Sequence, residues 1–188
     1  MIRFLTFYSI LVATVVLSSC NGQVKEKRIQ QIDSLGSILN HVNEVVTSVD
    51  PDLITGRVSE INETGNWFLD NLEDTLDPEP GIVLGDFFRC KKFYNKAAVR
   101  YNQVKTELEY SEAQLSSLRA DVNNGLYTDE EFDQHLKSEA TSTAKLLEAA
   151  DELDGSYTSV NTQFAKCKKA VVALKDSIKS IILSPDPV

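Results

Sequence analysis

Two histidines and several nearby carboxylates are the side chains best suited to metal or acid–base chemistry. Glu131, His135 and Glu139 are spaced four residues apart, so on a helix they share one face and offer ligands to a divalent ion. The residues around them are highly charged, which favours a solvated helix face over a closed metal site. The sequence contains no glycine-rich phosphate loop and no nucleophile in a recognisable arrangement with a base. We therefore expect no catalytic residue, no metal and no cofactor, and predict that the protein is not an enzyme.

The first 20 residues point to a different chemistry, the acylation of a cysteine. Arg3 precedes a mostly apolar run that is shorter than the roughly 20 residues needed to span a membrane. The run closes in Leu17-Ser18-Ser19-Cys20, and polar residues follow. This segment resembles the signal peptide of a bacterial lipoprotein precursor, in which an aliphatic residue and two small residues precede the lipidated cysteine.

That resemblance implies cleavage before Cys20 and attachment of diacylglycerol and palmitate-like acyl chains to it, which together give stable anchoring. Residues 1–19 are then a cleaved signal peptide, and residues 20–188 are expected to form a single helical domain. Asn21 stands where lipoproteins of the inner membrane often have Asp. The expected location is therefore the bacterial cell envelope, at the outer membrane, with the lipidated Cys20 holding the chain there.

The two remaining cysteines, Cys90 and Cys167, are candidates for a structural disulfide, which is the first hypothesis in an exported chain. The apolar pattern sets Cys90 opposite Phe164, three residues or about 4.5 Å along the axis from Cys167. Bridged Cα atoms lie roughly 4.4 to 6.8 Å apart, so the bridge needs a small slip or a local distortion. Two buried free thiols are the alternative. The absence of a Cys-x-x-Cys motif from the sequence argues against redox chemistry.

Composition predicts a helical protein. Proline occurs only at Pro51, Pro78, Pro80, Pro185 and Pro187. About a hundred residues from Gly81 onward are therefore free of proline and rich in good helix formers. The chain carries 28 Asp+Glu against 19 Lys+Arg, a formal net charge of −9, which argues against nucleic acid as a partner.

Apolar residues recur in alternating steps of three and four along four segments, which is the pattern of a coiled-coil seam. The shorter seams comprise Ile32, Leu35, Leu39, Val42, Val46 and Val49, and then Ile54, Val58, Ile61, Gly65, Phe68 and Leu72. The third seam comprises Phe87, Cys90, Tyr94, Ala97, Tyr101, Val104, Leu108, Ser111, Leu115, Leu118 and Val122. The fourth comprises Phe132, Leu136, Glu139, Thr143, Leu146, Ala150, Leu153, Tyr157, Val160, Phe164, Cys167, Val171, Leu174, Ile178 and Ile181.

The breaks between the seams predict the fold. Asn123-Asn124-Gly125 ends a helix, and Thr128 with Glu131 forms a capping box that starts the next one, with Tyr127 and Phe132 placed as a hydrophobic staple. Such a short connection makes the long helices antiparallel neighbours. The expected helices span residues 24–49, 53–76, 82–124 and 128–183. We predict an all-α fold: an up-down-up-down four-helix bundle at the base, which also holds the lipidated end, extended by a long antiparallel coiled-coil hairpin.

Charge is distributed unevenly along the expected rod. Cations lie between Arg89 and Lys105 and again between Lys166 and Lys179. They can pair with the acids of the second helix or contact anionic head groups. The acid-rich segment 106–154 favours a solvated arm over a site for cations or for a basic partner.

The predicted function is that of a lipid-anchored cell-envelope protein that presents a helical rod as an interaction module. An unknown envelope or extracellular protein is the expected partner, with Leu126 and Tyr127 at the hairpin tip as candidate contact residues. A structural spacer or a self-associating coiled coil, forming homo-oligomers, is the alternative. A sensor of metal ions or small ligands is a remote third possibility.

Overall fold

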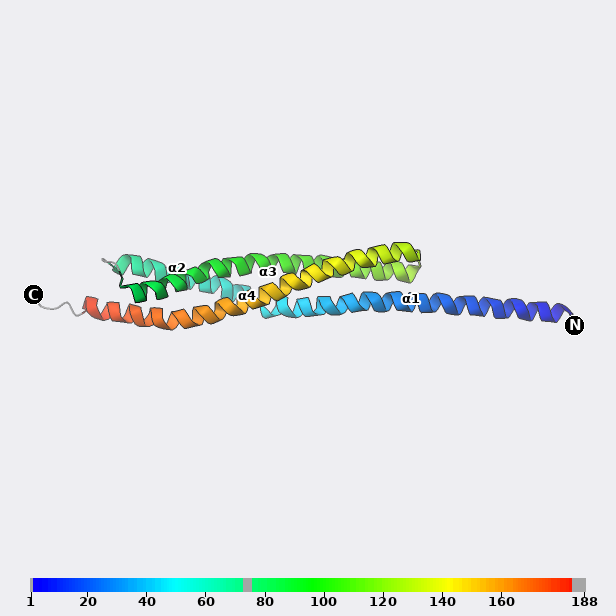
Figure 1. Cartoon of the computed structure of the whole chain (residues 1–188), viewed down its shortest axis with the longest axis horizontal. Helices are drawn as coiled ribbons and strands as arrows, with labels where there is room; N and C mark the ends of the chain where they lie inside the picture. The colour runs from blue at the N-terminus through cyan, green and yellow to red at the C-terminus, as the bar shows by residue number, and fades with distance from the viewer. Residues whose placement is uncertain (1, 73–75, 184–188) are drawn as a thin grey trace, which may run out of the picture. The chain divides into compact units, whose positions relative to one another are not determined.

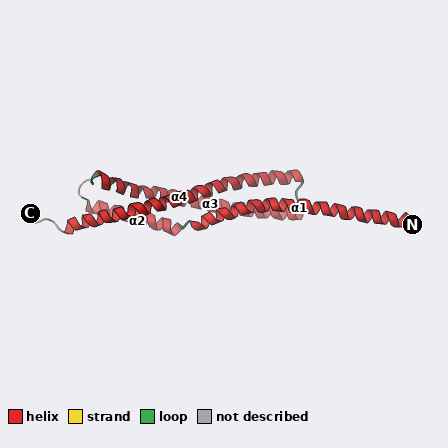
Figure 2. Cartoon of the chain, turned by 60° about the horizontal axis from the view of Figure 1, so that its bottom comes forward, coloured by secondary structure: helices red, strands yellow, loops and turns green. Residues whose placement is uncertain are grey.

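The computed structural model describes residues 2–72 and 76–183, with side chains described for residues 22–72, 76–180 and 182. Its elements are α1 (Ile2–Ser48), α2 (Pro51–Asn71), α3 (Pro78–Asn124) and α4 (Asp129–Leu183). Figure 1 shows these helices in chain order, and Figure 2 shows that the described residues contain helices and short connections without a strand. The predicted all-α class is confirmed.

Caps and prolines determine where the helices begin. The Asp50 carboxylate accepts hydrogen bonds from the backbone N–H groups of Asp52 at 2.9 Å and Leu53 at 3.0 Å, so Asp50 is the N-cap of α2. Pro51 follows at the first helical position, where its missing N–H is not needed. For this reason α2 begins two residues before the expected start. α3 similarly begins at a proline, Pro78, rather than at residue 82.

The chain divides into two compact units. Unit 1 combines Met1–Asn43 with Thr106–Leu147, and unit 2 combines Glu44–Lys105 with Glu148–Val188. Unit 1 therefore contains most of α1, whereas unit 2 contains all of α2, and both units draw on α3 and α4. This differs from the predicted bundle of all four helices at the base. Most of α1 belongs instead with residues 106–147, which we expected to extend beyond the bundle with no other helix beside them. The single-domain organisation of residues 20–188 stays a prediction.

The core of unit 1 follows the predicted seams. Its buried apolar residues are Ile32, Leu39 and Val42 from α1, Leu108, Leu115, Leu118 and Val122 from α3, and Phe132 and Leu146 from α4. Two polar seam residues, Ser111 and Thr143, are also buried. The Thr143 hydroxyl has no hydrogen-bond partner within the described part of the chain. The heptad pattern therefore outweighs the polarity of these two side chains, because each lies at a position that the helix turns inward.

The core of unit 2 contains a cluster of aromatic rings. The Phe164 ring of α4 lies 5.2 Å from the Phe87 ring and 5.8 Å from the Tyr94 ring, centroid to centroid, and both partners belong to α3. Further along the two helices, Arg100 pairs with Glu152 at 2.7 Å. Along the helix axis, Phe164 lies between Phe87 and Tyr94. This register places Phe164 opposite Cys90.

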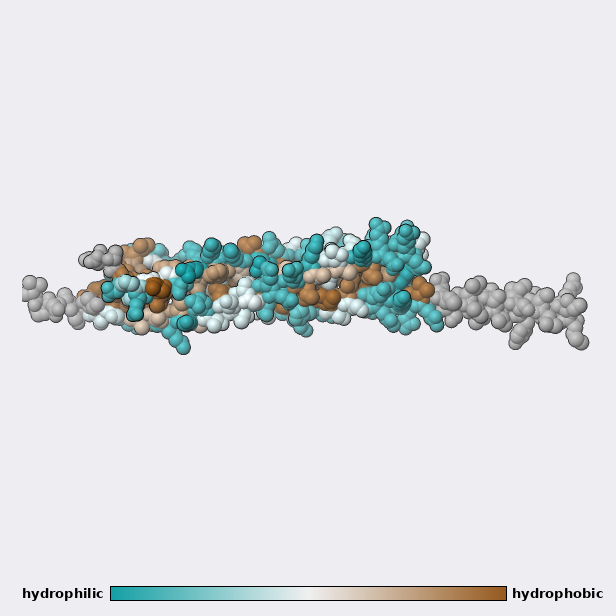
Figure 3. All heavy atoms as spheres, viewed as in Figure 1, coloured by the Kyte–Doolittle hydropathy of each residue, from teal (hydrophilic) through white to brown (hydrophobic). Residues whose placement is uncertain are grey.

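Charge pairing also holds unit 2 together. Lys168 of α4 pairs with Glu60 of α2 at 2.5 Å, as expected if the acids of the second helix lie beside the basic band. The Arg57 guanidinium lies 4.6 Å from the centroid of the Phe164 ring, and the Lys175 ammonium lies 4.8 Å from that of Trp67. In such cation–π contacts the electron-rich face of the ring attracts the cation. On the face drawn in Figure 3, apolar residues accordingly lie between rows of hydrophilic ones.

Candidate functional site

The connection between α3 and α4 is built as the sequence predicts. Gly125 has a φ of +68°, a left-handed conformation that glycine adopts without steric cost. Its N–H donates to the Val122 carbonyl at 3.2 Å, and the N–H of Leu126 donates to the Asp121 carbonyl at 3.1 Å. These two bonds close the end of α3 as a Schellman motif, because they satisfy carbonyls that have no partner within the helix.

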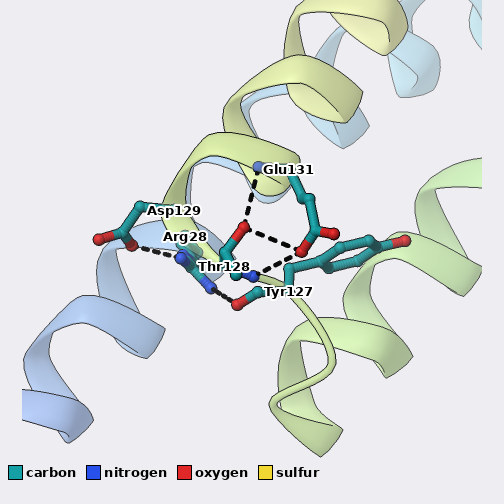
Figure 4. A network of polar contacts seen from close by, with 5 residues as sticks. All are labelled: Arg28, Tyr127, Thr128, Asp129 and Glu131. Carbon is teal, nitrogen blue, oxygen red and sulfur yellow. Dashed lines mark hydrogen bonds and ion pairs between the residues drawn. The ribbon is translucent and has the colours of Figure 1, made fainter.

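The capping box at the start of α4 is confirmed. The Glu131 carboxylate accepts from the Thr128 N–H at 3.0 Å, and the Thr128 hydroxyl oxygen accepts from the Glu131 N–H at 3.3 Å. Figure 4 shows these reciprocal contacts. The hydrogen bond from the Thr128 N–H, and then that from its hydroxyl, lower the pKa of Glu131, because both favour the ionised carboxylate.

Arg28 of α1 binds this connection, and the sequence analysis did not single it out. Its guanidinium donates to the Tyr127 carbonyl at 3.2 Å and forms an ion pair with Asp129 (Figure 4). It also lies 4.9 Å from the centroid of the Phe132 ring, and only 12% of its side chain is exposed. A guanidinium suits this position, because its planar fork donates in several directions while its face covers a ring.

Two further contacts join α1 to the same region. The Lys25 ammonium donates to the Asn123 carbonyl at 3.2 Å, and Asp33 forms an ion pair with Arg119. Gly22, Lys25 and Arg28 line a hollow of about 760 Å³ together with residues 122–125 and 127–129.

The expected placement of the N-terminal end at the base of the bundle is therefore wrong, since residues just beyond Cys20 lie beside the connection between α3 and α4. The cations ahead of the first seam and the acids at residues 129–133 are the signal in the sequence that points to this pairing.

The two candidate contact residues differ in exposure. Leu126 is 64% exposed, so its side chain is open to a partner. Tyr127 is half-buried: its hydroxyl donates to an Asp121 carboxylate oxygen at 3.0 Å, and its ring lies 5.1 Å from that of His135. Burial, and then the hydrogen bond to Asp121, raise the pKa of Tyr127. Tyr127 thus helps to form the connection, and Leu126 is the more accessible of the pair.

The remaining residues singled out for chemistry are placed as follows. The side chain of Cys20 lies outside the described residues. His135 contacts Tyr127 and Glu131 caps α4, so two of the three residues considered as metal ligands have structural partners. Within the described part of the chain, no three His, Cys, Asp or Glu side chains gather where they can hold a metal ion.

Cys90 and Cys167 are both buried free thiols, so the expected disulfide is not formed. Cys90 donates to the Asp86 carbonyl at 3.4 Å, and the Gln163 amide donates to the Cys167 sulfur at 3.3 Å. Burial, and then the neighbouring Cys167, raise the pKa of Cys90. The physical reason is the register: Phe164 lies level with Cys90, which leaves the two cysteines in different layers of the interface.

Comparison of the chain with protein-family models, curated proteins and solved structures finds no match. Over the residues that the structure describes, no helix has an apolar stretch long enough to cross a membrane. The fold and the site thus define an all-helical protein in which a polar network joins the N-terminal helix α1 to the turn between α3 and α4.

Proposed function

We propose that this chain is a lipid-anchored protein of the bacterial cell envelope, held at the outer membrane, which acts as a non-enzymatic interaction module. The observation that carries the proposal is the lipobox-like Leu17-Ser18-Ser19-Cys20 at the end of the apolar N-terminal run. Acyl chains on Cys20 anchor the protein, and the helical body presents side chains to other molecules.

In this proposal α3 and α4 form a single antiparallel coiled-coil hairpin. The burial of both long seams supports it, because ten of the eleven positions of the third seam lie in the core, with Tyr101 half-buried. The contacts of Phe164 with Phe87 and Tyr94, and of Arg100 with Glu152, support the antiparallel order. The hairpin acts as a scaffold, with α1 and α2 each covering part of it.

The position of Gly22 changes where a partner is expected to bind. Gly22 is two residues from Cys20 and lies beside the connection at residues 123–129. A lipid on Cys20 therefore holds Leu126 near the membrane surface rather than far from it. Leu126 then contacts the lipid interface or a membrane-proximal partner, and other surfaces serve partners in the aqueous phase.

Replacement of Cys20 tests the anchor. The full chain and its Cys20→Ser variant are expressed in a Gram-negative host that is fed an alkyne analogue of palmitate, and membranes are separated from soluble fractions. We expect the label and membrane retention in the original chain and loss of both in Cys20→Ser. Cys167→Ser is the control, because it removes a cysteine outside the motif. Equal labelling of all three proteins, or no labelling of any, contradicts the proposal.

A further inference from the structure

A groove in unit 2 combines cations with exposed apolar side chains. It has a volume of about 920 Å³ and follows one side of α3 from Phe88 to Gln103, with Ser156 of α4 at its edge. Phe93 is 46% exposed and Val99 is 59% exposed, although both are large apolar residues. We call this surface the α3 groove. An exposed aromatic ring and an exposed aliphatic side chain in one groove indicate an apolar surface that lacks a cover.

Three of the four cations that line the α3 groove have no acidic partner among the described residues. Lys91, Lys92 and Lys96 line it and make no hydrogen bond or ion pair among the described residues, whereas Arg100 is held by Glu152. No acidic residue occurs in the sequence between Phe87 and Thr106. Elsewhere in unit 2, Lys168 by contrast forms an ion pair with Glu60. The α3 groove is therefore a positive surface whose three lysines have no counter-charge in the described part of the chain.

The spacing of the lining residues suits a helix. Phe88, Lys92, Lys96, Val99 and Gln103 follow one another in steps of three and four, so they form a second stripe beside the buried seam of α3. The stripe is about 22 Å long, the length of a helix of about 15 residues. A helix that packs into such a groove places its apolar face on Phe93 and Val99 and its carboxylates beside the lysines.

A second copy of this chain does not fit the α3 groove. Its acidic segment, residues 106–154, turns its apolar seam into the cores of units 1 and 2, and only Tyr110 and Leu126 are exposed large apolar residues there. To present this segment as an acidic helix with a free apolar face, the chain would have to expose those cores. We propose that the α3 groove docks an acidic amphipathic helix from another protein. This inference deepens the proposed function as an interaction module, but it needs neither the lipid nor Leu126.

A binding experiment with the purified full chain tests the docking proposal. The probe is a fluorescent peptide of about 16 residues with leucine at alternating three- and four-residue spacing and glutamate on the remaining faces. A peptide of the same composition in scrambled order serves as its control. We expect the patterned peptide to bind, with affinity that falls as salt rises, and the scrambled one to bind at least about 10-fold more weakly.

Matched variants locate the site. Lys92→Glu with Lys96→Glu should weaken binding by about 10-fold, whereas Lys105→Glu with Lys166→Glu, an equal charge change outside the groove, should weaken it less than about twofold. Phe93→Ser with Val99→Ser should also weaken it about 10-fold, compared with Leu69→Ser and Ile82→Ser at exposed positions elsewhere. All substituted side chains are exposed, so each variant is expected to fold, and its circular dichroism verifies this.

Three outcomes overturn the proposal. The first is equal weakening by the two charge-reversed pairs, which would mean attraction without a site. The second is binding of phosphatidylglycerol vesicles that depends on Lys92 and Lys96 while the peptide does not bind, which would assign the groove to a membrane surface. The third is a dimer in light scattering that Phe93→Ser with Val99→Ser dissolves. Loss of membrane retention in Cys20→Ser affects only the anchoring proposal, so the two failures are distinguishable.

Discussion

The buried hydroxyl of Tyr94 donates a hydrogen bond of 2.9 Å to the Asn161 side-chain oxygen, across the interface of α3 and α4 in unit 2. Tyr94 is fully buried beside the Phe164 ring, so this bond satisfies a polar group that water cannot reach. Burial is the main reason that the pKa of Tyr94 rises to about 12, because the phenolate would lose its hydration there.

Tyr94→Phe should lower the free energy of unfolding at pH 8 by about 1 kcal/mol, the usual net contribution of such a bond. In the original chain, the unfolded state ionises near pH 10, whereas folded Tyr94 stays protonated to about pH 12. Unfolded chains then bind fewer protons, so stability falls as pH rises across this window, by at most about 3 kcal/mol from this residue.

Urea unfolding at pH 8 and pH 11 measures both effects. The variant lacks the Tyr94 contribution, so its stability should fall less between these pH values. Tyr110→Phe, at an exposed tyrosine, is the control. A pH dependence in Tyr94→Phe equal to that of the original chain would contradict the assignment.

Arg28→Met should lower the free energy of unfolding by about 1 to 2 kcal/mol, because the largely buried guanidinium holds the Tyr127 carbonyl and Asp129. Arg119→Met should cost less than about 0.5 kcal/mol, since Arg119 and Asp33 are both about half-exposed. Amide hydrogen exchange at residues 123–131 should speed up only in Arg28→Met. If the two variants behave alike, α1 is not held by this contact.

Thr143→Val should raise the free energy of unfolding by about 1 kcal/mol, because it removes a buried hydroxyl that has no partner in the described structure. Thr141→Val makes the same chemical change at an exposed position, where the hydroxyl bonds to the Lys137 carbonyl of its own helix. Thermal unfolding compares the two. A loss of stability in Thr143→Val would show that the hydroxyl is satisfied, for instance by a buried water.

Thiol counting tests the state of Cys90 and Cys167. The Cys20→Ser variant, unfolded without reductant, should release two reactive thiols, because both cysteines are free. In the folded protein both should react slowly with a thiol reagent, since burial restricts access and the raised pKa of Cys90 disfavours its thiolate. A count of zero after unfolding would reveal the disulfide that the sequence suggested.

Periodicity and capping were readable from the sequence because they are local properties of a helix. Seam residues such as Phe87, Leu118 and Leu153 are buried as predicted, since a 3.5-residue repeat decides which side of a helix is apolar whatever it meets. The Thr128–Glu131 box and the left-handed Gly125 follow from residue types only a few positions apart. The all-helical class could therefore be derived without any knowledge of long-range contacts.

The tertiary structure alone decided which segments the first helix covers and what remains open. The apolar seam of α1 could pack against the apolar face of any other helix. Its position beside the α3–α4 connection depends on the contacts of Arg28 with Tyr127 and Asp129, which are about a hundred positions away in the sequence. Cys90 and Cys167 likewise remain separate because the register puts Phe164 between Phe87 and Tyr94. The sequence also could not show that Phe93 is exposed in the α3 groove. A sequence specifies which helix faces are apolar, but not which of these faces the fold leaves uncovered.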